Sequence, residues 1–259
     1  MISNQLPALF IGHGSPMNVI SKNRYTEDLE KLAFQLPHPQ AILVISAHWL
    51  TRGTLITGAE KPEQIYDFYG FPQELYGIKY LAPGSPQTAN LVVETVGEGN
   101  IRIDQKRGID HAAWAVLKFL YPRQNIPVLE LSLNIDQGPS SHFELGKKLA
   151  PLRCKGILMI GSGNIVHNLR EMEYQEKAEA YDWAVEFDQF VRESIGKKDF
   201  AALINYRNFG TPAIRAVPTN EHYLPMLYIL GMMKASESAM FIHESIQNGS
   251  VSMRSFKIN

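Results

Sequence analysis

Short runs rich in Ile, Val and Leu recur along the chain, separated by longer segments in which apolar residues have helical spacing. The short runs lie at residues 9–11, 41–46, 126–132 and 156–160. They do not alternate polar and apolar side chains, so each predicts a strand buried on both faces of a sheet. The intervening helical segments are residues 25–36, 86–96, 112–120 and 143–152. This alternation predicts one α/β domain over residues 1–259, a layered α/β/α fold with a largely parallel or mixed central sheet.

Two regions depart from this regular alternation. Residues 51–85 are rich in Gly, Pro and aromatic side chains and have no clear period. Long irregular segments in compact domains are often functional loops or lids, although the aromatic residues between Tyr66 and Tyr80 could equally pack a small core of their own. In the C-terminal third, residues 181–195 have helical spacing, and a Pro-containing region at 211–225 precedes another apolar helix.

The charge balance limits the classes of partner. The 259 residues include 25 basic and 26 acidic side chains, for a net charge of −1, with no block of like charge. This argues against nucleic acid or an anionic membrane as partner and favours a small-molecule substrate. The longest uncharged apolar run, residues 223–233, contains a proline and is too short to span a membrane.

Cysteine usage and the N-terminus indicate the compartment and the type of metal site. The single cysteine, Cys154, allows neither an internal disulfide nor a thiolate zinc site. Residues 1–9 lack the basic start and the long apolar stretch of a secretory signal. We therefore expect a cytoplasmic protein, in which any metal ligands are histidines and carboxylates.

Three histidines follow predicted strands. His13 comes after residues 9–11, His48 after residues 41–46, and His167 a few residues after the strand that runs into Gly161-Ser162-Gly163-Asn164. Ligands bind beyond the carboxyl ends of the strands in open α/β sheets. We therefore expect these imidazoles to converge at one edge of the sheet, although a lone histidine after a strand is more often a hydrogen-bonded structural residue.

His222 is the fourth candidate. Proline is tolerated best in the first turn of a helix, so Pro225 predicts a helix that begins nearby, with Thr219 or Asn220 as a plausible cap. The positive end of the helix dipole favours the neutral imidazole that a metal requires. Glu221 is a rival for this role; it should point about 100° away from its neighbour, so only one of the two should face the site.

The remaining histidines and glycines leave alternatives open. His111 in Asp110-His111-Ala112-Ala113-Trp114 could be a helix-start residue held by Asp110, or an acid or base near the reacting groups. The other three, His38, His142 and His243, are expected on the surface.

The segment from Gly161 to Asn164 could hold an anion at a helix start, a weak signal by itself. The chain has no Walker loop, no dinucleotide-binding glycine fingerprint and no nucleophile elbow.

Six motifs together resemble the LigB-type class III extradiol ring-cleavage dioxygenases, and most closely their 4,5-DOPA dioxygenase extradiol branch. In chain order they are Pro7 to Met17, Ser46-Ala47-His48-Trp49, Asp67-Phe68-Tyr69-Gly70-Phe71-Pro72, Asp110 to Trp114, Gly161-Ser162-Gly163-Asn164 with His167-Asn168-Leu169, and Glu221-His222-Tyr223-Leu224-Pro225. The likeness covers nearly the whole chain.

The resemblance implies a non-haem Fe(II) centre at which a catechol and O2 react to give a muconate semialdehyde. His13 and His48 match metal ligands of the family, and His222 stands at the position of the third, where a glutamate is usual. His167 matches a histidine that acts as base or acid, and His111 one close to the substrate. An all-imidazole set also suits zinc, so zinc could occupy the site with His167 as a fourth ligand.

A rival interpretation belongs to another class of protein. The same scaffold could serve a metal-containing binding or signalling protein, or a metal hydrolase. The presence of both His167 and His111 favours the enzyme, since a binding module needs neither proton carrier. L-DOPA as the substrate follows only from the branch resemblance. The oligomeric state stays open, a homodimer included.

Overall fold

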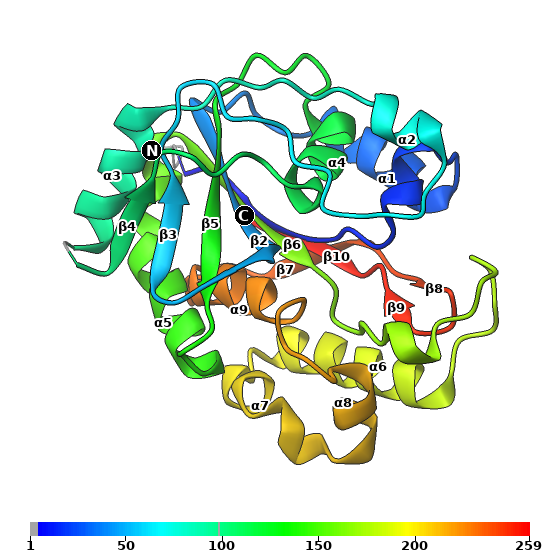
Figure 1. Ribbon diagram of the computed structural model, residues 1–259. Coiled ribbons are helices and arrows are strands. Elements are labelled where there is room, and N and C mark those ends of the chain that lie inside the picture. Colours follow the sequence, from blue (N-terminus) through cyan, green and yellow to red (C-terminus); the bar gives the residue numbers. More distant parts are fainter. Residues whose placement is uncertain (1–4, 98) are drawn as a thin grey trace.

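The computed structural model describes residues 5–97 and 99–259, and within them eight strands form one mixed sheet (Figure 1). Their order across the sheet is β4-β3-β5-β2-β6-β1-β10-β7, with β8 and β9 in a separate pair. The strands are β1 (Ala8–Gly12), β2 (Ala41–Thr51), β3 (Thr54–Thr57), β4 (Ile101–Asp104), β5 (Val128–Asn134), β6 (Ile157–Gly163), β7 (Ala239–His243), β8 (Ile246–Gln247), β9 (Val251–Ser252) and β10 (Ser255–Ile258).

The four predicted strands are the parallel centre of this sheet. β5, β2, β6 and β1 pair in parallel, while β3 and β10 flank them in antiparallel pairing. β4 continues parallel to β3, and β7 runs antiparallel to β10. The predicted layered α/β fold with a mixed sheet is therefore confirmed. The flanking strands were missed because they are short or carry no distinct apolar pattern.

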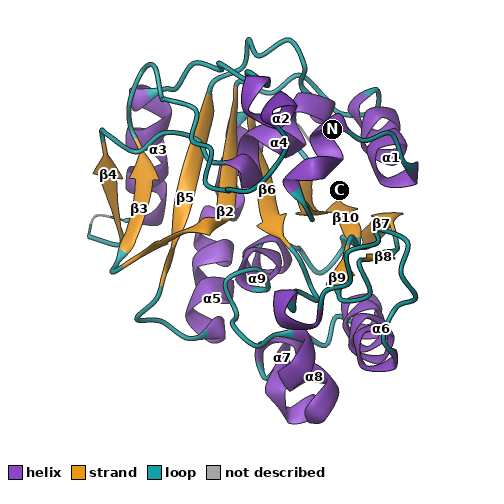
Figure 2. Ribbon diagram, turned by 45° about the vertical axis from the view of Figure 1, so that its right-hand side comes forward, coloured by secondary structure: helices purple, strands orange, loops and turns teal. Residues whose placement is uncertain are grey.

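Helices cover both faces of the sheet (Figure 2). They are α1 (Arg24–Ala33), α2 (Gln73–Gly77), α3 (Pro86–Val96), α4 (His111–Leu120), α5 (Pro139–Leu149), α6 (Asp182–Lys197), α7 (Phe200–Ile204), α8 (Thr211–Ala216) and α9 (Leu224–Gly231). Short 3-10 turns occur at Pro16–Ile20, Ala150–Lys155, Leu169–Glu171 and Tyr206–Phe209. The apolar core is accordingly split into two layers, one with α1 and α4 and the other with α3, α5, α6 and α9.

Burial on both faces explains the apolar strands. In β1, Ala8 and Phe10 pack into one layer, and Leu9 and Ile11 into the other. Both sets of side chains are fully buried, so no position on this strand is available to a polar residue that faces solvent. The absence of polar alternation in the sequence follows directly.

Several predicted boundaries differ from the structure. The predicted helix 143–152 ends at Leu149, and a 3-10 turn containing Pro151 follows, because proline cannot donate the backbone hydrogen bond that the α-helix needs. Residues 161–163 lie inside β6, so the expected helix start for an anion there is wrong. His142 and His243 are buried, which corrects their expected surface position; His38 is exposed.

No helix within residues 5–97 and 99–259 is both long and apolar enough to cross a membrane.

The contact between α5 and α9 depends on two glycines. A Cβ atom built on Gly146 of α5 would lie 2.2 Å from the carbonyl oxygen of Tyr228 in α9. A Cβ atom on Gly231 at the end of α9 would lie 2.2 Å from the carbonyl oxygen of Phe143. The two backbones therefore approach each other more closely than any side chain permits. This packing holds α9, and the segment that precedes it, against the sheet.

Gly146→Ala is expected to lower the free energy of unfolding by about 1–3 kcal/mol, because the added methyl group overpacks a backbone contact. The matched control is Gly196→Ala in α6, where nothing lies within 4 Å of the added Cβ atom. That substitution should raise stability by about 0.4–1 kcal/mol through helix propensity and unfolded-state entropy. Equilibrium denaturation by urea measures both, and an equal change in the two variants would contradict the packing argument.

Candidate metal centre

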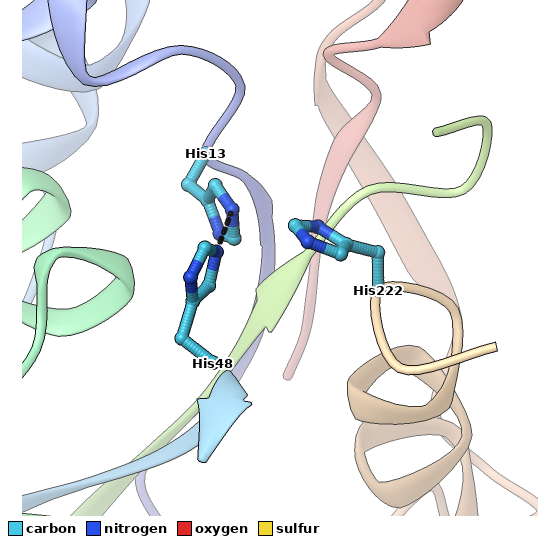
Figure 3. Close-up of side chains that lie close together, drawn as sticks. All are labelled: His13, His48 and His222. Carbon is cyan, nitrogen blue, oxygen red and sulfur yellow. Dashed lines mark hydrogen bonds between the residues drawn. The ribbon is translucent and has the colours of Figure 1, made fainter. Parts of the chain in front are cut away.

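Three imidazoles from distant parts of the chain point toward one another (Figure 3). His13 follows β1, His48 lies in β2, and His222 precedes α9. One ring nitrogen from each lies within 4.8 Å of the other two, and the Nε2 atoms of His13 and His48 are 3.3 Å apart. Two nitrogens bound to one ion at about 2.1 Å would be roughly 3.0–3.4 Å apart. The spacing therefore fits a shared divalent cation.

The strand order produces this convergence. β6 lies between β2 and β1 in the sheet, and all three run in parallel, so their carboxyl ends meet at one edge. β2 continues past residue 46, where the sequence pattern predicted its end. Its pairing with β5 is irregular between Ile45 and Leu50, and such an irregularity re-aims side chains. His48 lies within this irregular stretch.

Glycines allow the three segments to come close together. A Cβ atom on Gly163, at the end of β6, would lie 2.1 Å from the carbonyl oxygen of His222. A Cβ atom on Gly12, directly before His13, would lie 2.8 Å from the backbone carbon of Met253. Any larger residue at either position would push a histidine-bearing segment away from the sheet edge.

Hydrogen bonds at Nδ1 fix the orientation of all three rings. Ser162 donates its hydroxyl proton to the carbonyl oxygen of Ala112, at 2.6 Å, so its oxygen can only accept from His13 Nδ1, at 2.9 Å. The Asp67 carboxylate accepts from His48 Nδ1 at 2.8 Å.

His222 Nδ1 faces Asn164 Oδ1 at 3.3 Å, and the amide orientation of Asn164 is set because its nitrogen donates to Ser252 O, at 2.8 Å. These hydrogen bonds place a proton on Nδ1 of each ring and leave Nε2 as the nitrogen available to a metal.

The surroundings keep two of these rings neutral. Burial lowers the pKa of His13 well below its ordinary value, and the neighbouring His48 and His111 lower it further. Burial, followed by the nearby His167, has the same effect on the pKa of His222. For His48, burial is the largest single effect and would lower the pKa, but the hydrogen bond to Asp67, together with the charges of Asp110, Asp67 and Glu221, raises it overall. Neutral imidazole is the form that binds a metal.

Asp67 is the residue of the site to which sequence reasoning assigned no role. Its Oδ2 atom accepts from Nδ1 of both His48 and His111, at 2.8 and 2.9 Å, and its Oδ1 atom accepts from the backbone N–H of His111, at 2.9 Å. Burial is the largest single effect and opposes ionisation, but the hydrogen bonds from His111 and His48, together with the electrostatic attraction of both rings, hold the pKa of Asp67 below its ordinary value. Asp67 opens one of the six motifs that carry the family resemblance, but that motif gave it no role.

His111 has a different partner from the one expected. Asp110, the expected partner, instead caps α4 through the backbone N–H of Ala112 and accepts from the hydroxyl of Ser46. The imidazole of His111 is held by Asp67, and its ring centroid lies 4.2 Å from that of His48. His111 is buried and lines the cavity described below.

His167 and Glu221 both lie close to His222. The His167 ring stacks on the His222 ring, with centroids 3.5 Å apart and planes 11° apart. His167 and Glu221 form a second potential metal-binding group with His222, separate from the one that contains His13 and His48. Burial, with the nearby His48 and His111, lowers the pKa of His167 to about 3.

The helix that follows His222 begins as expected, but with a different cap. α9 starts at Leu224 with Pro225 in its first turn, and Tyr223 is the cap residue without a side-chain hydrogen bond. The backbone carbonyl of Asn220 accepts from the N–H groups of Tyr223 and Leu224, while Thr219 donates its hydroxyl to Glu221. Neither of the two expected caps therefore acts through its side chain.

A cavity of about 290 Å³ opens over the imidazoles. Its floor is formed by His13, His48, His111, His167, His222 and Asp67. Its walls are mainly apolar and include Phe68, Phe71, Leu169, Met172 and Val251. The cavity is large enough for a single aromatic ring with a substituent, next to the point on which the Nε2 lone pairs converge.

The chain is similar to known proteins over nearly its whole length. The family described as the catalytic LigB subunit of aromatic ring-opening dioxygenase matches residues 8–255. The 4,5-DOPA dioxygenase extradiol of Escherichia coli K12 is 44% identical, over 100% of this chain and 96% of that protein. The protein of the same name from Beta vulgaris is 35% identical, over 96% and 94%. A crystal structure of an uncharacterized E. coli K12 protein has a TM-score of 0.86 and 40% identity, covering 98% of this chain and 100% of that one.

Asp67→Asn is expected to weaken binding of a divalent cation such as Co(II) by about 10- to 100-fold, the usual effect of losing a carboxylate that orients a histidine ligand. Asp28→Asn is a matched control, because Asp28 Oδ2 accepts from Nδ1 of His243 at 2.9 Å, outside the cluster. Calorimetric titration of the metal-free protein measures both variants. Equal affinities in wild type and Asp67→Asn would show that the Asp67 hydrogen bond does not orient a ligand.

Proposed function

We propose a substrate and a metal for this chain, which belongs to the LigB family of aromatic ring-opening dioxygenases and is an extradiol ring-cleavage enzyme. The proposed substrate is a catechol such as L-DOPA, and the proposed metal is Fe(II) held by His13, His48 and His222. The products would be a muconate semialdehyde that contains both atoms of O2. The proposal treats residues 1–259 as one LigB-like domain. The observation that carries it is the convergence of one ring nitrogen from each of these three histidines beside a mainly apolar cavity.

The donor set fits a divalent transition metal. Three neutral imidazoles suit Fe(II), and they suit Zn(II) equally well. When bound, Fe(II) would polarise the catechol hydroxyls and supply the redox chemistry toward O2, whereas Zn(II) is redox-inert. We therefore propose Fe(II) for activity and expect that zinc can occupy the same site in purified protein.

His167 is proposed as the proton acceptor for the catechol. Its lowered pKa means that the ring is neutral near pH 7 and can accept a proton. Its ring lines the cavity and stacks on His222, so it lies next to the proposed ligand set. An anionic substrate beside His167 would raise its pKa and so favour the transfer of the proton from the hydroxyl to the imidazole.

His111 and the aromatic wall complete the proposed site. Because Nδ1 of His111 donates to Asp67, its Nε2 atom is available to hydrogen-bond a catechol oxygen or O2. Phe68 packs against His111, with ring centroids 5.5 Å apart, and Phe71 packs against Phe68. These rings exclude water from one side of the cavity, as a site for reactive oxygen intermediates requires.

The rival interpretation, a metal-binding protein without dioxygenase activity, is not favoured by the comparisons, since the relatives across the whole chain are named as dioxygenases.

His222→Ala should reduce the amount of metal bound per chain to below about a tenth, because it removes one of three proposed ligands. Glu221→Ala, a change at the adjacent residue, should leave metal content near that of wild type. Metal analysis by mass spectrometry after loading and desalting gives the comparison. Retention of metal in His222→Ala together with its loss in Glu221→Ala would assign the third ligand to the carboxylate.

His167→Gln should keep metal content near normal while kcat falls by about 100-fold or more, the scale expected for loss of a general base or acid. The pH dependence of kcat/KM should also lose the limb that depends on this base. If metal content falls in parallel with activity, His167 is a ligand, as a four-histidine zinc site would require.

Anaerobic loading with Fe(II), followed by oxygen uptake with a panel of catechols, tests the function itself. We expect one O2 consumed for each catechol, both labelled atoms recovered in the product after reaction with ¹⁸O2, and no uptake by the zinc-loaded protein. Absence of uptake with every catechol, in protein that has demonstrably bound Fe(II), would favour the rival class.

A further inference from the structure

A second, much smaller cavity adjoins two histidines of the site. It has a volume of about 10 Å³, and its lining includes His13 and His111, which also line the larger cavity. Most of the remaining lining comes from the 3-10 turn at Pro16–Ile20, from α1 and from α4. A volume of roughly 10–15 Å³ is the least that holds one water-sized molecule. The small cavity is therefore of the right size for a very small ligand beside the imidazoles, and it is too small for a catechol.

Apolar side chains supply most of this lining beyond the two histidines. They are Val19, Tyr25, Ala115, Val116 and Phe119. The two polar exceptions already have partners. Asn18 donates to Gln247 at 3.2 Å and accepts from Asn23 at 3.0 Å, and the hydroxyl of Ser15 accepts from the backbone N–H of Met17 at 3.2 Å. Cavities with apolar walls bind apolar gases such as xenon, which need no hydrogen-bond partner.

One face of α4 connects the small cavity to the protein surface. His111, Ala115 and Phe119 are spaced four residues apart, so they lie on the same face of the helix at successive turns. All three line the small cavity. Phe119 is half-buried and also lines a mainly apolar surface groove of about 530 Å³. The small cavity and the groove therefore share Phe119 as a wall.

A bound catechol would obstruct the larger cavity for a second molecule. That cavity has a volume of about 290 Å³ and aromatic walls that include Phe68 and Phe71, so one substituted ring would fill much of it. The proposed reaction requires O2 at the same centre as the catechol. A route along α4 would bring O2 to His111 without crossing the space that the catechol occupies.

We propose that O2 reaches the metal centre through the small cavity, from the surface groove past Phe119 and Ala115 to His111. The inference rests on the proposed ring-cleaving function and assigns a separate binding site to its gaseous co-substrate. O2 is small, uncharged and apolar, so it loses no hydrogen bonds among these side chains, whereas water and ions would. Passage requires only rotamer changes along the path, which are fast compared with turnover.

Krypton tests the binding site without turnover, because it is close to O2 in size and visible by anomalous scattering. Crystals of the zinc-loaded protein under krypton pressure should show one atom next to Ala115 and Phe119. Ala115→Leu should abolish this peak, because the larger side chain fills the cavity. Ala150→Leu is the matched control, since Ala150 is also partly buried but packs in the other core layer, and the peak should remain. An ordered water in the wild-type cavity at every krypton pressure would overturn the proposal.

Steady-state kinetics test the path in the Fe(II)-loaded enzyme. At saturating catechol, Ala115→Leu should lower kcat/KM for O2 by about tenfold, which corresponds to an added barrier of about 1.4 kcal/mol. At saturating O2, kcat/KM for the catechol should stay near that of wild type. Phe119→Trp narrows the outer end of the path at a half-buried position and should act in the same direction, so the test survives if Ala115→Leu fails to fold. Ala150→Leu should leave both constants unchanged.

An unchanged kcat/KM for O2 in Ala115→Leu and Phe119→Trp would place the entry of O2 in the larger cavity and overturn the proposal. An equal fall in the constants for O2 and for the catechol would do the same, because it would indicate a general disturbance of the site. Failure of the ring-cleaving function would look different. No variant would then consume a catechol, although krypton would still bind in the small cavity of the zinc-loaded protein.

Discussion

Three hydrogen bonds at imidazole Nδ1 atoms decide which nitrogen each ring offers in the proposed metal centre. Ser162, Asp67 and Asn164 each accept from one ring and so leave the Nε2 atoms of His13, His48 and His222 with lone pairs that face a common point. The Nε2 atoms of His13 and His48 lie 3.3 Å apart, close enough either to share a proton or to bind one cation. The close backbone contacts at Gly12 and Gly163 hold the segments that carry these rings together.

The composition of the ligand set has consequences for charge. In the proposed set of three neutral imidazoles, a divalent ion would keep its full charge, and an anionic catechol would then be its counter-charge. The Asp67 carboxylate, one hydrogen bond behind His48, supplies the only nearby negative charge within the described cavity lining. In the proposed complex, the charge of the ion would therefore be balanced at the metal, while the cavity walls are mainly apolar.

Much of this arrangement could be predicted from the sequence because it depends on local patterns. Uninterrupted apolar runs gave the four central strands, and the positions of His13 and His48 after them gave the convergence at one sheet edge. Pro225 correctly indicated a helix that begins next to His222. Asp67 could not be placed, because it lies in an irregular segment whose path depends on tertiary packing. The burial of His142 and His243 was missed for a related reason: each is covered by partners distant in sequence, Tyr228 and Asp28.

Anomalous X-ray diffraction from crystals of the Fe(II)-loaded protein, collected on both sides of the iron absorption edge, examines the central claim most directly. We predict one strong anomalous peak about 2.0–2.2 Å from the Nε2 atoms of residues 13, 48 and 222. A peak bound instead by His111 and Asp67, or by His167 and Glu221 without His13 and His48, would contradict the account.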